Sequence, residues 1–245
     1  MSDTNPFTAP RASTLPSSDS GPRKVSIEPI ALYKRSLALI GDQYWLFLGI
    51  AVVGIILGSV VPFGLLLGPM MVGIYLCFID RERGKQVEFG TLFKGFDYFA
   101  NSFIAILIMI GISLIVIIPL IIMMIVAMFL VLPSNGGGQP SPLVIPIAIV
   151  SYLAMFIAMF LVQLPFLFTF QLIAERGLTG PQAVGLSFKG VQKNLSGCVL
   201  LAIVIGVIST LASMACILPS FFLMPITLGA LFLAYRDIFG PSVSQ

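Results

Sequence analysis

Three long apolar runs dominate the pattern of hydrophobic and polar positions along the chain. Residues 43–79, 98–174 and 194–235 contain no Asp, Glu, Lys or Arg. About 20 apolar residues are enough for a helix that crosses a bilayer, so each run has room for two crossings. A charge at the bilayer centre costs at least about 2.5–3.5 kcal/mol. The pattern therefore predicts that the three runs lie in a membrane.

Turn-forming residues divide each run in two. The breaks fall at Val61-Pro62-Phe63-Gly64, at residues 133–142 and at Leu218-Pro219-Ser220, where Pro, Gly and Ser favour turns. We predict an all-α fold, a polytopic membrane helix bundle with six transmembrane helices. The expected boundaries are spans at about 43–61, 63–79, 100–132, 143–173, 197–218 and 220–236, in a membrane domain 25–240 with tails 1–24 and 241–245.

The basic residues predict the orientation of these spans. All 13 Lys and Arg lie in the N-terminal segment, in the connections after the second and fourth spans, or at the C-terminal end. An even number of spans puts these segments on one face, and cytoplasmic segments carry the excess of Lys and Arg. We expect a multi-pass protein of a bacterial cytoplasmic membrane with both termini inside. The Ser- and Pro-rich tail 1–24 is predicted to be disordered, and it lacks the apolar stretch of a signal peptide.

The three predicted hairpins share a plan. Each begins with an aromatic–lysine pair, has a proline early in its returning span and ends at an acidic–basic cluster. The matching residues are Tyr33-Lys34, Phe93-Lys94 and Phe188-Lys189; Pro69, Pro165 and Pro225; and Arg81, Arg176 and Arg236 with their acidic neighbours. This predicts a threefold repeat of same-orientation hairpins. The alternative is that membrane proteins reuse such residues in any case.

The middle hairpin is longer than the other two. Pro119 and Pro165 are 46 residues apart, whereas the corresponding prolines of the outer hairpins are 7 and 6 residues apart. The extra helix would tilt, thicken the outer end of the bundle or form a re-entrant segment. The sequence leaves these three arrangements open.

An amphipathic helix is predicted before the first span of each hairpin, at the cytoplasmic surface. The expected apolar faces are Ile30, Tyr33, Leu37 and Ile40; Phe89, Leu92, Phe93, Phe96 and Phe99; and Val184, Phe188, Val191 and Leu195. We interpret these helices as elbows that anchor the spans, with lipid-headgroup sensing or partner docking as the alternative. The predicted interfacial anchors are Lys34, Lys94, Lys189, Arg81, Arg176 and Arg236.

Polar side chains and prolines inside the spans give two further hypotheses. Gln163, Pro165, Thr169 and Gln171 form the best candidate for an intramembrane polar patch, since an amide in lipid needs a partner and a proline frees a carbonyl. The alternative is ordinary helix–helix hydrogen bonding. Pro69, Pro165 and Pro225 are candidate hinges, or else static kinks.

Composition argues against several classes of function. The chain has no histidine, and its three cysteines have no metal-site spacing. No phosphate loop or nucleophile–base motif is present. The net charge of +3 is too small to indicate nucleic-acid binding. We expect no catalytic residues, no cofactor and no metal.

Six spans, the cytoplasmic Phe93-Lys94-Gly95 and Phe188-Lys189-Gly190 segments and the terminal Tyr235-Arg236-Asp237 cluster resemble one bacterial group. It comprises integral membrane proteins, without an assigned activity, related to the membrane domain fused to some glycerophosphodiester phosphodiesterases. The resemblance covers residues 28–240 and implies the membrane fold alone. Phosphodiesterase catalysis in that group uses histidine, which this chain lacks, so the activity is not transferred.

We therefore expect a non-enzymatic membrane protein that organises lipids or partner proteins. The alternatives are a transporter or pore for a neutral or lipid-like solute and, third, an intramembrane enzyme acting on lipid. The expected partners are the lipid bilayer and a membrane protein or a second copy of the chain, and no nucleic acid. A cavity lined by Gln163, Thr169, Ser209 and Ser213 would favour transport, whereas a solidly packed bundle would favour the scaffold.

Overall fold

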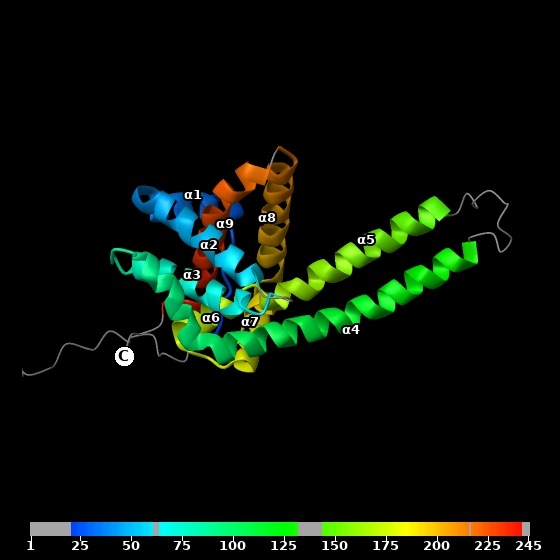
Figure 1. Ribbon diagram of the computed structural model, residues 1–245, viewed down its shortest axis with the longest axis horizontal. Coiled ribbons are helices and arrows are strands. Elements are labelled where there is room, and N and C mark those ends of the chain that lie inside the picture. Colours follow the sequence, from blue (N-terminus) through cyan, green and yellow to red (C-terminus); the bar gives the residue numbers. More distant parts are fainter. Residues whose placement is uncertain (1–20, 61–63, 132–143, 216, 242–245) are drawn as a thin grey trace, which may run out of the picture.

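Helices make up nearly all of the part of the chain that the computed structural model describes, residues 21–60, 64–131, 144–215 and 217–241 (Figure 1). The α-helices are α1 (Pro29–Ile40), α2 (Tyr44–Val60), α3 (Leu67–Glu82), α4 (Phe99–Val131), α5 (Val144–Gln163), α6 (Thr169–Arg176), α7 (Gly180–Lys193), α8 (Leu195–Ala215) and α9 (Ile217–Phe239). Three 3₁₀ segments, η1 (Gly41–Gln43), η3 (Phe89–Tyr98) and η4 (Leu164–Phe166), join neighbouring helices. No strand occurs in the described residues.

Five helical stretches among these residues are long and apolar enough to cross a membrane. They are Pro29–Val60, Phe89–Ala127, Ile145–Arg176, Leu195–Met214 and Pro219–Phe239. The first three join elements that follow one another closely, such as α1, η1 and α2, whereas the last two lie within α8 and α9. The predicted all-α fold is confirmed for the described residues, with five helical stretches whose length and composition suit a membrane.

The predicted second span is the exception. It corresponds to α3, which has 16 residues and is therefore about 24 Å long, shorter than the roughly 30 Å of a hydrocarbon core. The helix begins only at Leu67, after a turn in which Gly64 has φ 64°. Most of its side chains are buried by α2, η3 and α6. A helix surrounded by protein does not have to match the bilayer thickness, so an apolar run alone does not predict its length.

The packing between helices follows one rule around the bundle. α2 packs against α3, α4 against α5 and α8 against α9. In addition, η3 packs against α3, α7 packs against α6, and α1 packs against α9. The segment before each helix pair thus contacts the second helix of the preceding pair. For the first pair, that partner is the second helix of the last pair. The largest side chains in the core between them are aromatic, and the rings of Phe78 and Phe232 stack with centroids 5.6 Å apart.

The pair α4 and α5 forms a long arm that leaves the body in a direction different from that of α8 (Figure 1). α4 has 33 residues and continues past Pro119 without interruption, so it is about 50 Å long. Ile115, Phe129 and Phe156 on the arm are 65–75% exposed. The described residues of the arm are continuous helices that lie side by side. The connection at 132–143, which includes the whole predicted break at 133–142, lies outside the described residues.

The three amphipathic segments pack against the bundle mainly through residues outside the apolar faces that were predicted to lie in the membrane interface. Small residues form most of the buried faces of η3 and α7: Thr91 and Gly95 in η3, and Ala183, Ser187 and Gly190 in α7. In α1 the buried Ser36 lies between the larger Leu32 and Ile40. Most of the predicted apolar residues, including Ile30, Leu37, Phe93, Phe96 and Phe188, are instead exposed. Close contact between helix backbones requires small side chains. The larger apolar side chains are therefore left on the outside.

In η3 the predicted apolar residues divide between an exposed row and a buried row. The prediction used the α-helical period, but this segment is a 3₁₀ helix, in which residues three apart are aligned. Phe93, Phe96 and Phe99 then form one exposed row, and Leu92 and Gly95 belong to the next, buried row. In an α-helix the residues of these two rows would lie on one face, whereas in a 3₁₀ helix they lie on two.

Candidate functional site at the charged end of the bundle

Arg236, near the end of α9, is a deeply buried charged group among the described residues. Its side chain is 7% exposed and bonds Glu82 of α3 and Glu175 of α6. The Glu175 side chain is 1% exposed and also accepts a hydrogen bond from the Tyr235 hydroxyl. Three returning helices thus meet through one arginine. Arg236, predicted as an interfacial anchor, is instead part of an interior network.

This network arises because the acidic–basic clusters of three helices converge. A buried charge is tolerated only when it is paired and hydrogen-bonded, and Arg236 meets both conditions. Its guanidinium also lies 5.1 Å from the centroid of the Phe232 ring, an added cation–π contact. Sequence alone shows three similar clusters, but it does not show that one arginine serves two carboxylates from other helices.

The remaining predicted anchors divide into two groups. Lys34, Lys94 and Lys189 are exposed on α1, η3 and α7, where anchors were expected. Arg81 instead donates to the Leu39 carbonyl and pairs with Asp42, while Arg176 donates to the Phe239 carbonyl at 2.9 Å. These two arginines join helix ends to each other.

The predicted intramembrane polar patch is split. Gln163 is exposed at the end of α5, and Pro165 is partly buried. Thr169 and Gln171 are buried in α6, and the hydroxyl of Thr169 and both amide atoms of Gln171 have no hydrogen-bond partner in the described residues. Nearby, the Phe168 amide donates to the Ser187 hydroxyl at 3.1 Å. The break near Pro165 turns Gln163 away from the interior that Thr169 and Gln171 occupy.

The three candidate hinges have different surroundings. Pro165 lies in η4, which interrupts the path from α5 to α6. Pro69 lies in the first turn of α3, where a missing amide costs no intrahelical hydrogen bond. Pro225 lies inside α9, which continues through it. A helix break therefore accompanies Pro165 alone, and hinge motion at any of the three remains a prediction.

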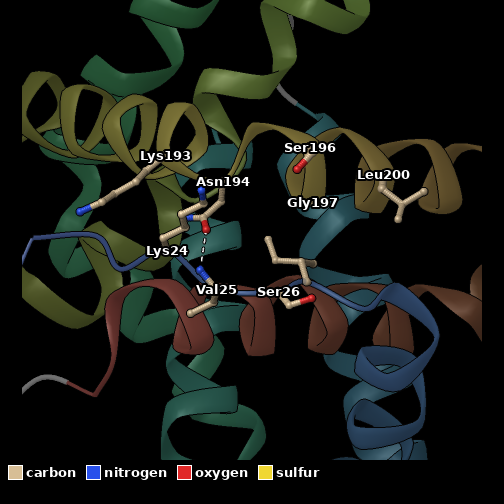
Figure 2. A pocket seen from close by; sticks show the side chains of 9 residues that line it. Lys24, Val25, Ser26, Lys193, Asn194, Ser196, Gly197 and Leu200 are labelled. Carbon is tan, nitrogen blue, oxygen red and sulfur yellow. Dashed lines mark hydrogen bonds between the residues drawn. The ribbon is translucent and has the colours of Figure 1, made fainter.

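A pocket of about 200 Å³ lies beside this end of the bundle, between the extended segment before α1 and the start of α8 (Figure 2). Asn194 holds the segment in place: its Oδ1 accepts from the Val25 amide at 2.8 Å, and its Nδ2 donates to the Arg23 carbonyl at 2.7 Å. The Arg23 amide donates to the Ile238 carbonyl. Residues 21–24, predicted as part of a disordered tail, are therefore bound to the bundle; residues 1–20 lie outside the described residues.

Replacing Asn194 with Ala is expected to release this segment. The buried amide serves Val25, Arg23 and Gly190 at once, and one lost hydrogen bond of this kind corresponds to about 1–1.5 kcal/mol. Hydrogen exchange should show protection of the Val25 amide falling about tenfold. The neighbouring exposed Gln192→Ala variant should leave it unchanged. Equal protection in both variants would contradict the role of Asn194 in holding the segment before α1.

A second hollow is the apolar groove of about 560 Å³ between α5 and α8. Phe156 and Phe160 line one side, and Ile203 and Val207 line the other. Its polar member, Thr210, donates its hydroxyl to the Gly206 carbonyl at 2.8 Å. The groove therefore presents almost only hydrocarbon.

Groups that commonly hold metals or act as nucleophiles do not gather in the described part of the chain. No group of three or more His, Cys, Asp or Glu there could hold a metal ion. Cys77 and Cys198 are buried, free thiols. Sequence reasoning did not find the pocket at Lys24, Lys193 and Asn194, because it assigned Lys24 to the tail. The signal available was that the polar residue Asn194 begins the third apolar run.

Comparison with known proteins adds no family to this description, because no protein-family model matches the chain and neither curated proteins nor solved structures give a significant match.

Proposed function

We propose that this chain is a non-enzymatic integral membrane protein that organises lipids or partner proteins at the cytoplasmic surface of a bacterial membrane. The observation that carries this proposal is the close packing of the central helices. A Cβ added at Gly73 would meet the Leu92 backbone, one at Gly95 would meet the Pro69 carbonyl, and one at Gly229 would meet the Ser36 hydroxyl. These contacts leave no room for a solute path between the paired segments.

The residues that a pore would need also lie apart. Gln163, Ser209 and Ser213 are exposed on the outside of α5 and α8, whereas Thr169 is buried. Ser213 donates its hydroxyl to the Ser209 carbonyl within α8 at 2.8 Å, which satisfies that donor locally. Exposed polar groups that bond their own helix suit a surface in contact with lipid. The transporter alternative consequently has less support.

The proposed topology has six crossings, with the charged helix ends and both termini in the cytoplasm. The five long apolar stretches supply five crossings, and α3 supplies a short sixth inside the bundle. The 33-residue α4 exceeds the bilayer thickness, so the arm would cross at a strong tilt. The different directions of the arm and α8 (Figure 1) support tilt over a re-entrant segment.

A threefold arrangement of same-orientation hairpins is part of the proposal. Its support is the cyclic packing of η3 on α3, α7 on α6 and α1 on α9. The ion pairs that join Arg236 to Glu82 and Glu175 connect the ends of the three hairpins. The exposed rows of Phe93 and Phe96 would then face lipid at the inner surface. The group suggested by the sequence resemblance would share this plan.

Solute flux into proteoliposomes tests the scaffold against the transporter. Purified full-length protein should give no more uptake of glycerol or other small neutral solutes than empty vesicles, with a known channel as the positive control. The reason is the close backbone packing at Gly73 and Gly95. Uptake above empty vesicles that scales with protein content would overturn the scaffold proposal.

A further inference from the structure

We infer that the pocket beside Lys24 and Lys193 and the groove between α5 and α8 together bind one anionic phospholipid, with its headgroup at the lysines and an acyl chain along α8. This inference rests on the proposed function, because it requires the charged end of the bundle to lie at a membrane surface. It goes further by naming a lipid class and a site.

The headgroup end of the site is polar and basic. Lys24, Lys193 and Ser196 line the pocket. The two lysines form no ion pair with the described residues. Figure 2 shows Ser196 in the first turn of α8 and the extended segment with Val25 and Ser26 opposite that helix, while Lys193 extends outward beyond Asn194. Lysine has a flexible four-carbon stem, so both ammonium groups can reach a phosphate at the mouth.

The charge around this pocket favours an anion. A neighbouring hollow of about 430 Å³ shares Leu200 and Ile27 with the pocket and adds Lys34 and Glu28. Three lysines and one acidic side chain therefore line the two hollows together. Anionic lipids concentrate in the cytoplasmic leaflet, where each nearby Lys or Arg contributes about 1 kcal/mol of attraction.

The same face of α8 leads from this pocket to the apolar groove. Ser196, Leu200, Ile203 and Val207 recur at i, i+4, i+7 and i+11, which is one side of an α-helix. Val207 lies about 16 Å beyond Ser196 along the axis, the depth of one leaflet's hydrocarbon. Leu200, Ile203 and Val207 are each about half exposed.

The groove is the reason for choosing a lipid over free phosphate. Phe156 and Phe160 of α5 and Ile203 and Val207 of α8 line a space that a hydrocarbon chain fits. A Cβ at Gly206 in its wall would meet nothing within 4 Å, so the backbone there is open to an occupant. Inorganic phosphate would use only the basic end of this site.

Native mass spectrometry tests the inference on full-length protein released from nanodiscs. The discs contain equal amounts of phosphatidylglycerol and phosphatidylcholine with identical chains. The wild type should retain phosphatidylglycerol preferentially, and Lys24→Gln with Lys193→Gln should lower that preference roughly thirtyfold. The control, Lys94→Gln with Lys189→Gln, removes two exposed lysines elsewhere and should keep it. Equal preference in the two double variants would overturn the inference.

Two further experiments distinguish binding of a whole lipid from binding of an anion alone. Gly206→Leu should fill the groove and reduce retention of both lipids, whereas Gly111→Leu, at an equally open glycine on α4, should not. Identical retention in these two variants would overturn the groove assignment. Inorganic phosphate should fail to displace phosphatidylglycerol, and displacement would show an anion site without a lipid.

A separate topology measurement distinguishes this inference from the proposed function. In sealed vesicles, accessibility of a reporter at residue 137 to a membrane-impermeant probe shows whether the protein crosses the bilayer. A protein that inserts correctly but shows no lipid preference refutes the inference alone. A protein that fails to insert as proposed refutes the topology on which both depend.

Discussion

Replacing Arg236 with Met is expected to destabilise the folded protein by about 3–5 kcal/mol. The change removes the partner of Glu175, whose side chain is 1% exposed, and of Glu82. Breaking a buried ion pair from one side leaves an uncompensated charge, and this accounts for the size of the effect. Reversible unfolding in mixed micelles, followed by circular dichroism, gives the free energy of unfolding.

Arg35→Met is the matched control, because Arg35 also pairs with a carboxylate, that of Asp237, but its side chain is 51% exposed. Exposed pairs contribute about 0.2–1 kcal/mol, so this variant should remain close to the wild type. Adding Glu175→Gln and Glu82→Gln to Arg236→Met should recover part of the loss, because the two side chains that lost the arginine are then uncharged. Equal stability of the two arginine variants would contradict a buried network.

Replacing Gly73 with Ala is the second large effect that we expect. A Cβ at this position of α3 would meet the Leu92 carbonyl oxygen and would lie 2.8 Å from its carbonyl carbon. Both atoms belong to the backbone of η3, which cannot rotate away as a side chain could. Overpacking of this kind costs about 1–3 kcal/mol and occasionally more, so the free energy of unfolding should fall by at least that amount.

Gly111→Ala provides the control for helix propensity. Gly111 lies inside α4, and a Cβ there would meet nothing within 4 Å. Alanine is favoured over glycine by about 1 kcal/mol in a helix interior, so this variant should be as stable as the wild type or slightly more stable. A Gly73→Ala variant that behaves in the same way would show that α3 and η3 are not in backbone contact.

The helices themselves could be predicted from the sequence because the bilayer imposes one simple requirement. Long uncharged runs separated by Pro- and Gly-rich turns predicted both ends of α2, α4 and α8 within a few residues, and the start of α5. The fourth span was predicted to continue to residue 173, but α5 ends at Gln163, where η4 interrupts the helix. A second exception, α3, begins four residues after the predicted start of its span, because the chain first turns at Gly64. Burial by neighbouring helices decides such a boundary, and burial is not visible in one apolar run.

The candidate sites were harder to predict, for two physical reasons. Periodicity alone does not decide between the α and 3₁₀ periods in η3, nor between an apolar face that meets lipid and a small-residue face that meets a helix, as Phe188 and Ser187 show in α7. The role of Arg236 depends on Glu82 and Glu175, which are 154 and 61 residues away in sequence. Such a contact follows only from the packing of the whole bundle.

The central claim is that lipid surrounds the helix pairs and that all charged helix ends lie on the inner side. Reporter fusions test it most directly: green fluorescent protein, which is fluorescent inside the cell, and alkaline phosphatase, which is active outside, each placed at residue 137 and after residue 245. We expect phosphatase activity only at residue 137 and fluorescence only after residue 245. The same reporter active at both positions would contradict the account.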